Sequence, residues 1–129
     1  MTKYELRQYR DISREIEQLR EQQAGLIRLV KEHDGQPRGS GVSDPTGKAG
    51  ATMATISSRI DDLLVSLLDL RDEIERAIEH LPPRERMLMR YYYIDCMTWE
   101  QVAERMHYSR QHTLRLHGAI LGKLKDETK

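Results

Sequence analysis

Aromatic residues are scarce in this chain. Its 129 residues include no Phe and a single Trp, and aromatic residues make up 5% of the sequence. Long aliphatic side chains therefore supply most of the apolar surface, and charged residues account for 33% of the chain. A composition of this kind argues against a large globular core and is typical of helices and coiled coils.

Cysteine and long apolar runs are also nearly absent. Cys96 is the single cysteine, so no disulfide can form within the chain. The sequence shows neither a signal peptide nor an apolar run long enough to cross a membrane. These features argue against a secreted protein. We expect the protein to be located in the reducing cytoplasm and not to associate with a membrane.

Groupings of side chains that carry enzyme chemistry are missing as well. No Ser, His and Asp arrangement and no metal-ligand spacing emerges, and His107, His112 and His117 cannot share one helical face. The segment GVSDPTGKA lacks the spacing of a phosphate-binding loop, and no strand precedes it. We therefore expect no enzymatic activity, no cofactor and no metal.

The formal net charge is zero, but acidic and basic residues are unevenly distributed. Residues 1–81 hold 12 basic and 15 acidic residues, whereas residues 82–129 hold 9 basic and 6 acidic residues. The two parts therefore carry net charges of −3 and +3. A basic C-terminal part is compatible with nucleic-acid binding, which the overall charge by itself would argue against.

Two apolar-periodic segments joined by a very short turn follow Thr98. In the first segment, Thr98 and Gln101 have the spacing of a capping box. Val102 and Met106 then lie four residues apart, as on one face of a helix. This pattern predicts the first helix of a helix-turn-helix.

The second segment follows Ser109, a further N-cap candidate. Apolar residues mark its inner face at every fourth position: Leu116, Ile120 and Leu124. Its outer face keeps polar side chains that can read base edges: Arg110, Gln111, His112 and Arg115. Because Arg and Gln form paired hydrogen bonds to guanine and adenine, we expect this helix to read double-stranded DNA. The alternative is the solvated face of a helix in a small bundle.

Three further side chains are expected to contact DNA phosphates: Thr98, Ser109 and Lys123. Between Ser109 and Lys125 there are four Lys or Arg residues and no Asp or Glu. A stretch with this charge attracts the phosphate backbone whatever the base sequence.

The segment LPPRERMLMRYYYIDCMTWEQVAERMHYSRQHTLRLHGAILGKL resembles region 4 of sigma factors, their C-terminal promoter-reading domain. It is still more similar to the version in phage and prophage late-transcription regulators of the RinA and ArpU kind. The shared features are RERMLMRYYYID in a first helix, TWEQVAERM in a second and YSRQ opening a third. Two departures are His107, where Gly is usual in the turn, and Thr113, where Val or Ile is usual.

The resemblance implies a three-helix helix-turn-helix domain in an all-α protein. It also implies a transcriptional regulator that activates late genes at promoters together with RNA polymerase in a bacterial host cell. The alternative is a protein-interaction adaptor whose sigma-like domain binds RNA polymerase or another regulator without reading DNA.

Two long helices are expected before this domain. In residues 3–31 apolar residues follow a three-four repeat that is broken at Gln23, where a polar residue in the seam can fix register or partner number. The composition of residues 33–43 predicts a flexible loop. Asp44 and Pro45 then supply an N-cap and a first-turn proline.

The second long helix carries a regular apolar seam. Residues at steps of three and four along it are the candidates for oligomerisation: Ile56, Ile60, Leu63, Leu67, Leu70 and Ile74. We expect an antiparallel hairpin over residues 1–81 and a helix-turn-helix domain over residues 82–129 that folds by itself. Because the apolar stripe is too wide for two helices, self-association into a dimer or higher oligomer is predicted. The alternative is a hairpin folded onto its own C-terminal domain.

Overall fold

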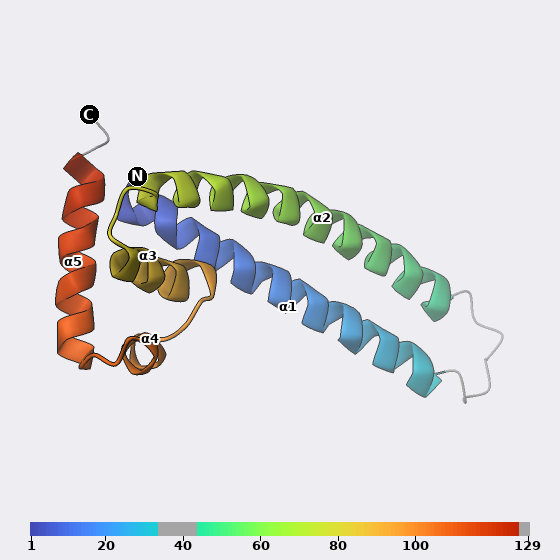
Figure 1. Ribbon diagram of the computed structural model, residues 1–129. Helices are drawn as coiled ribbons and strands as arrows, with labels where there is room; N and C mark the ends of the chain where they lie inside the picture. Colours follow the sequence, from blue (N-terminus) through green and yellow to red (C-terminus); the bar gives the residue numbers. More distant parts are fainter. Residues whose placement is uncertain (34–43, 127–129) are drawn as a thin grey trace. The chain divides into compact units, whose positions relative to one another are not determined.

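The computed structural model describes residues 1–33 and 44–126 (Figure 1). No strand occurs within these ranges, so the predicted all-α class is confirmed. The elements in chain order are α1 (Lys3–His33), α2 (Pro45–Ile78), α3 (Pro83–Met89), η1 (Arg90–Ile94), α4 (Trp99–Met106) and α5 (Arg110–Asp126). The predicted loop lies outside the described residues apart from His33. None of the helices in these ranges is long and apolar enough to span a bilayer.

Local sequence signals set the start of two helices. Asp44 precedes α2, and its Oδ1 accepts a hydrogen bond of 3.0 Å from the backbone N–H of Gly47. Pro45 is then the first residue of α2, as predicted. Pro83 likewise opens α3, where the missing N–H of proline has no helical partner to lose.

The chain forms two compact units, and both long helices run through both of them. One unit comprises Ser13–Ser66, and the other combines Met1–Ile12 with Leu67–Lys129. Their limits do not coincide with the boundary that the sequence predicts at residue 81. The reason is that the ends of the two long helices share a core with the C-terminal helices.

The unit of residues 13–66 pairs α1 with α2. Apolar residues from both helices are buried there: Ile16, Leu19, Ile56 and Ile60. Gln23, the polar residue in the repeat of α1, donates a hydrogen bond of 2.8 Å from Nε2 to the Ser57 hydroxyl on α2. The polar position in the seam is therefore occupied by a contact within one chain.

The other unit has one hydrophobic core built from distant parts of the sequence. Five of its buried residues precede Pro82: Leu6, Tyr9, Ile74, Ile78 and Leu81. They pack with residues of the C-terminal helices: Leu88, Met89, Tyr93, Val102, Met106, Ile120 and Leu124. Within this unit, the first turns of α1 and the last turns of α2 therefore support the helix-turn-helix directly.

Arg10 connects the start of α1 to the C-terminal helices through polar contacts. It is 8% exposed, and its Nη1 donates to the carbonyl oxygens of Tyr92 and of Met97, the latter at 3.1 Å. Its guanidinium also lies 4.0 Å from the centre of the Tyr92 ring. Burial of this charge is thus compensated by two hydrogen bonds and an aromatic face.

The first helix expected for the C-terminal domain is divided in two. α3 ends at Met89, and the π-helical turn η1 follows, in which the Asp95 N–H reaches back five residues to the Arg90 carbonyl at 2.8 Å. Around this turn Tyr93 is fully buried, and the Tyr92 ring stacks on Trp99 at a centroid distance of 3.7 Å.

Candidate nucleic-acid interface

The capping box at the start of α4 is present as predicted. The Thr98 hydroxyl accepts a hydrogen bond of 3.2 Å from the Gln101 N–H, and the Gln101 side chain accepts one of 2.9 Å from the Thr98 N–H. Two backbone donors that the helix itself cannot satisfy are thereby paired. The box fixes where the first helix of the motif begins.

The turn between α4 and α5 depends on one residue in the left-handed region. His107 has φ 59° and ψ 40°, the conformation that glycine usually supplies at this place in a helix-turn-helix. Ser109 then caps α5, since its Oγ accepts a hydrogen bond of 3.1 Å from the His112 N–H. Thr113, the second departure from the family pattern, is fully buried, and its hydroxyl donates to the Ser109 carbonyl at 2.9 Å. Neither departure leaves a buried polar side-chain atom without a hydrogen-bond partner.

His117 lies on the inner face of α5 and is 6% exposed. Its Nε2 is 2.6 Å from the Tyr93 hydroxyl, and its ring centroid is 4.6 Å from that of Trp99. Burial, together with the positive charges of Lys3 and Arg7, lowers the pKa of His117 to about 4. The side chain is therefore neutral at pH 7 and adds no charge to the surface of α5.

The outer face of α5 presents the four residues predicted to read bases. Arg110, Gln111, His112 and Arg115 are all exposed at the N-terminal end of the helix. The His112 ring meets Tyr108 edge-on at 4.6 Å. Nε of Arg110 lies 3.1 Å from a carboxylate oxygen of Glu100 on α4, and the two side chains are 59% and 68% exposed. The four side chains thus share one exposed end of the helix, where Arg110 has an acidic neighbour.

The residues predicted to contact phosphates already have partners within the chain. The Thr98 and Ser109 hydroxyls serve as helix caps. Lys123 forms an ion pair of 2.8 Å with Glu85, whose side chain is 12% exposed. Phosphate binding by Lys123 therefore has to compete with this pair, whereas hydroxyl oxygens retain capacity for a further hydrogen bond.

Three arginines near α3 have structural roles that the sequence analysis missed. Arg84 donates to the Tyr108 hydroxyl and to the Met106 carbonyl, both at 2.6 Å, and so holds the end of the motif's turn. Arg90 pairs with Glu75 through Nε and Nη2, and this contact lowers the pKa of the Glu75 carboxyl. Arg86 donates to the Leu81 carbonyl at 3.2 Å. Most of these partners are too distant in sequence for spacing to reveal them.

The six predicted oligomerisation residues are largely covered by their own chain. Ile56, Ile60 and Ile74 are buried. The other three are half-buried: Leu63, Leu67 and Leu70. Larger exposed apolar surface lies elsewhere on the long helices, with Leu29 at 62% and Ile27 at 42% exposure.

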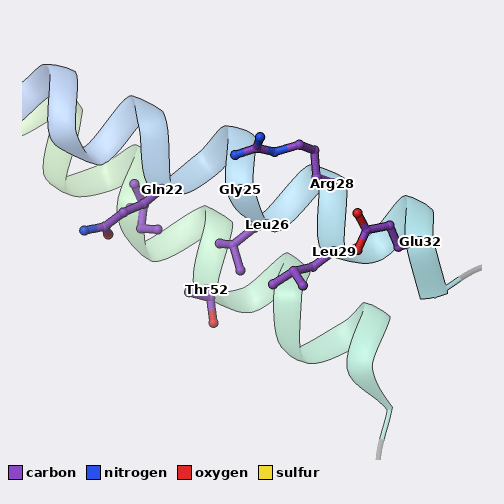
Figure 2. Close-up of a pocket in the computed structure, with 8 residues that line it drawn as sticks. Gln22, Gly25, Leu26, Arg28, Leu29, Glu32 and Thr52 are labelled. Atoms are coloured by element: carbon purple, nitrogen blue, oxygen red, sulfur yellow. The ribbon is translucent and has the colours of Figure 1, made fainter.

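A groove runs between the C-terminal part of α1 and the N-terminal part of α2 (Figure 2). Leu26 and Leu29 of α1 and Thr52 and Ile56 of α2 line it. Figure 2 shows Leu26 and Leu29 directed toward α2, whereas the guanidinium of Arg28 points away from it. Ile56 of the predicted seam is thus part of this groove.

Comparison with known proteins identifies the central part of the C-terminal unit. The family model described as Sigma-70, region 4 matches residues 71–111, from the end of α2 to the first turn of α5. The helix-turn-helix is sigma region 4-like. Curated relatives include the RNA polymerase sigma factor SigF of two strains of Mycobacterium tuberculosis, each 29% identical over 89 residues. That alignment covers 69% of this chain but 32% of the relative, so the chain spans about a third of the length of these relatives. No solved structure gives a significant match.

Residues 1–33 and 44–126 contain no group of three or more His, Cys, Asp or Glu side chains placed to hold a metal ion. Cys96 is half-buried in the turn before α4, with φ 56°.

Proposed function

We propose that the protein is a sequence-specific DNA-binding regulator of transcription that places α5 in the major groove. The observation that carries this proposal is the exposed cluster of Arg110, Gln111, His112 and Arg115 at the start of α5. It follows a capped helix and a tight turn, which is the geometry with which helix-turn-helix proteins present a recognition helix. Arg110, Gln111 and Arg115 have side chains that can form paired hydrogen bonds to purines.

Contacts to the phosphate backbone of DNA would supply the part of the affinity that does not depend on base sequence. The start of α4 offers N–H groups beside Thr98, and the start of α5 offers them beside Ser109, as helix N-termini do for anions. Lys123 would contribute a phosphate contact after leaving Glu85. Binding is then expected to weaken steeply as salt is raised.

The similarity to sigma region 4 supports action at promoters with bacterial RNA polymerase. The finer assignment, a phage or prophage late-gene activator in the bacterial cytoplasm, rests on the resemblance of residues 81–124 to regulators of the RinA and ArpU kind. Activation of a late promoter in a reporter strain, dependent on Arg110 and Gln111, would test it.

Self-association through the hairpin is the second part of the proposal. The predicted seam is mainly covered within the chain, so two exposed residues of α1 become the better support for it: Leu29, which lines the groove of Figure 2, and Ile27. Two recognition helices related by a two-fold axis would read an inverted repeat with half-sites about 34 Å apart or a multiple of that spacing.

The central experiment measures binding of the full chain to a duplex selected from a random-sequence library and to a shuffled duplex. Arg110→Ala or Gln111→Ala should cost about 1 to 3 kcal/mol on the selected duplex and relax sequence preference. Lys123→Ala should weaken both duplexes alike. Arg59→Ala, an exposed arginine of α2, is the matched control and should change neither.

Unchanged affinity of both the Arg110 and Gln111 variants for the selected duplex would contradict the assignment of the recognition helix. If the wild type binds no duplex even at low salt but is retained by RNA polymerase, the adaptor function takes its place. The exposed apolar residues Val65 and Leu68, at 61% and 59%, are the observation that favours such an adaptor.

A further inference from the structure

The contact between Glu100 and Arg110 brings an acidic group to the tip of the proposed recognition helix. Glu100 lies in the first turn of α4, and Arg110 is the first residue of α5. Oε1 of the Glu100 carboxylate lies 3.1 Å from Nε of the Arg110 guanidinium. A carboxylate at this place lowers the attraction for phosphate, so its presence in a DNA-facing surface calls for a reason.

We infer that Glu100 is a positioning residue that sets the base specificity of Arg110. This inference rests on the proposed function and concerns how the same site discriminates between sequences. A contact at Nε orients the plane of the guanidinium while the two terminal amino groups stay available for O6 and N7 of a guanine. The negative charge also repels phosphate oxygens that would otherwise capture this arginine. Glu100 thus keeps the terminal amino groups of Arg110 available for a base edge.

The high exposure of both side chains supports a role in binding over a role in stability. With 59% and 68% of the side chains exposed, water screens the pair, and such pairs add little to the folded state. When DNA excludes that water, the same contact becomes stronger. The pair therefore matters most in the complex.

The test compares Glu100→Gln with Glu104→Gln in the full chain. Both variants remove one negative charge from an exposed position on α4, but Glu104 forms no ion pair within the described residues. The probes are a duplex that the wild type selects from a random-sequence library and a shuffled duplex of equal composition. The measured quantity is the ratio of the two affinities at fixed salt.

We expect Glu100→Gln to lower this specificity ratio roughly two- to fivefold, in keeping with the modest strength of exposed pairs. Glu104→Gln should strengthen binding to both probes equally and keep the ratio. In an Arg110→Lys background, which lacks Nε, Glu100→Gln should no longer change the ratio. Thermal unfolding should be the same for all Glu variants, which separates positioning from folding.

An unchanged ratio in Glu100→Gln, with selective binding by the wild type, would overturn this inference and leave the proposed function intact. A fall that persists in the Arg110→Lys background would also overturn it, because Glu100 would then act without the arginine. Absence of any duplex binding by the wild type would instead overturn the proposed function and this inference together.

Discussion

A fragment from Pro82 to Lys129 should fail to fold, although it contains the whole helix-turn-helix. The fragment lacks five residues that the full chain buries to 6% exposure or less: Leu6, Tyr9, Ile74, Ile78 and Leu81. Burying a large apolar side chain contributes about 1.5 to 3 kcal/mol, so the loss amounts to about 10 kcal/mol. That is as large as the whole stability of a typical small domain, about 5 to 15 kcal/mol. The sequence by itself led to the opposite expectation, because the motif signals begin at Pro82.

The assay is urea unfolding followed by far-ultraviolet circular dichroism on the fragment and on the full chain. Single substitutions in the full chain give the same information in graded form. Leu6→Ala should lower the free energy of unfolding by about 2 to 5 kcal/mol, since Leu6 is fully buried. Gln18→Ala, at an exposed position of the same helix, is the control and should stay within about 0.5 kcal/mol.

A cooperative unfolding transition of the fragment, with the helicity expected from α3, α4 and α5, would refute this reasoning. So would a Leu6→Ala variant as stable as the Gln18→Ala variant. Either result would mean that the helix-turn-helix has an adequate core of its own.

Three further predictions concern stability and assembly. As pH falls from about 6.5, where unfolded His117 takes up a proton, toward its folded pKa of about 4, the free energy of unfolding should fall by up to about 3 kcal/mol. Urea titrations should show this loss in the wild type and in the control His112→Gln, and a loss of equal size in His117→Gln would contradict it. Thr98→Ala should cost about 1 kcal/mol through the lost cap, measured in the same way, and Thr98→Ser should restore most of it. Replacing Leu63 and Leu67 by Glu should dissociate any oligomer or unfold the hairpin. Sedimentation measures the oligomeric state, and a wild type that sediments as a monomer at tens of micromolar would remove the basis for self-association.

The parts of the fold that the sequence predicted correctly depend on local interactions. The caps at Asp44, Thr98 and Ser109 join atoms three residues apart, so the residue type and its spacing are sufficient. Pro45 starts α2 for an equally local reason, because proline fixes its own backbone angle and lacks an N–H. The assignment of the exposed face of α5 followed from the period of its buried residues, Ile120 and Leu124 among them.

Tertiary structure decided what lies across those apolar faces. Periodicity shows that a helix has an inner face but not which segment covers it. The sequence therefore left open whether the hairpin packs on another copy or on its own C-terminal domain, and it did not single out Leu6 and Ile78 as residues beside α3 to α5. The same holds for charged side chains. Arg10 and Arg84 look like ordinary solvated arginines in the sequence, yet each donates to backbone carbonyls of a segment far along the chain. The sequence alone determined where the helix-turn-helix lies and which of its faces is polar. Only the packing of distant segments determined that the first turns of α1 and the last turns of α2 belong to the core of the helix-turn-helix.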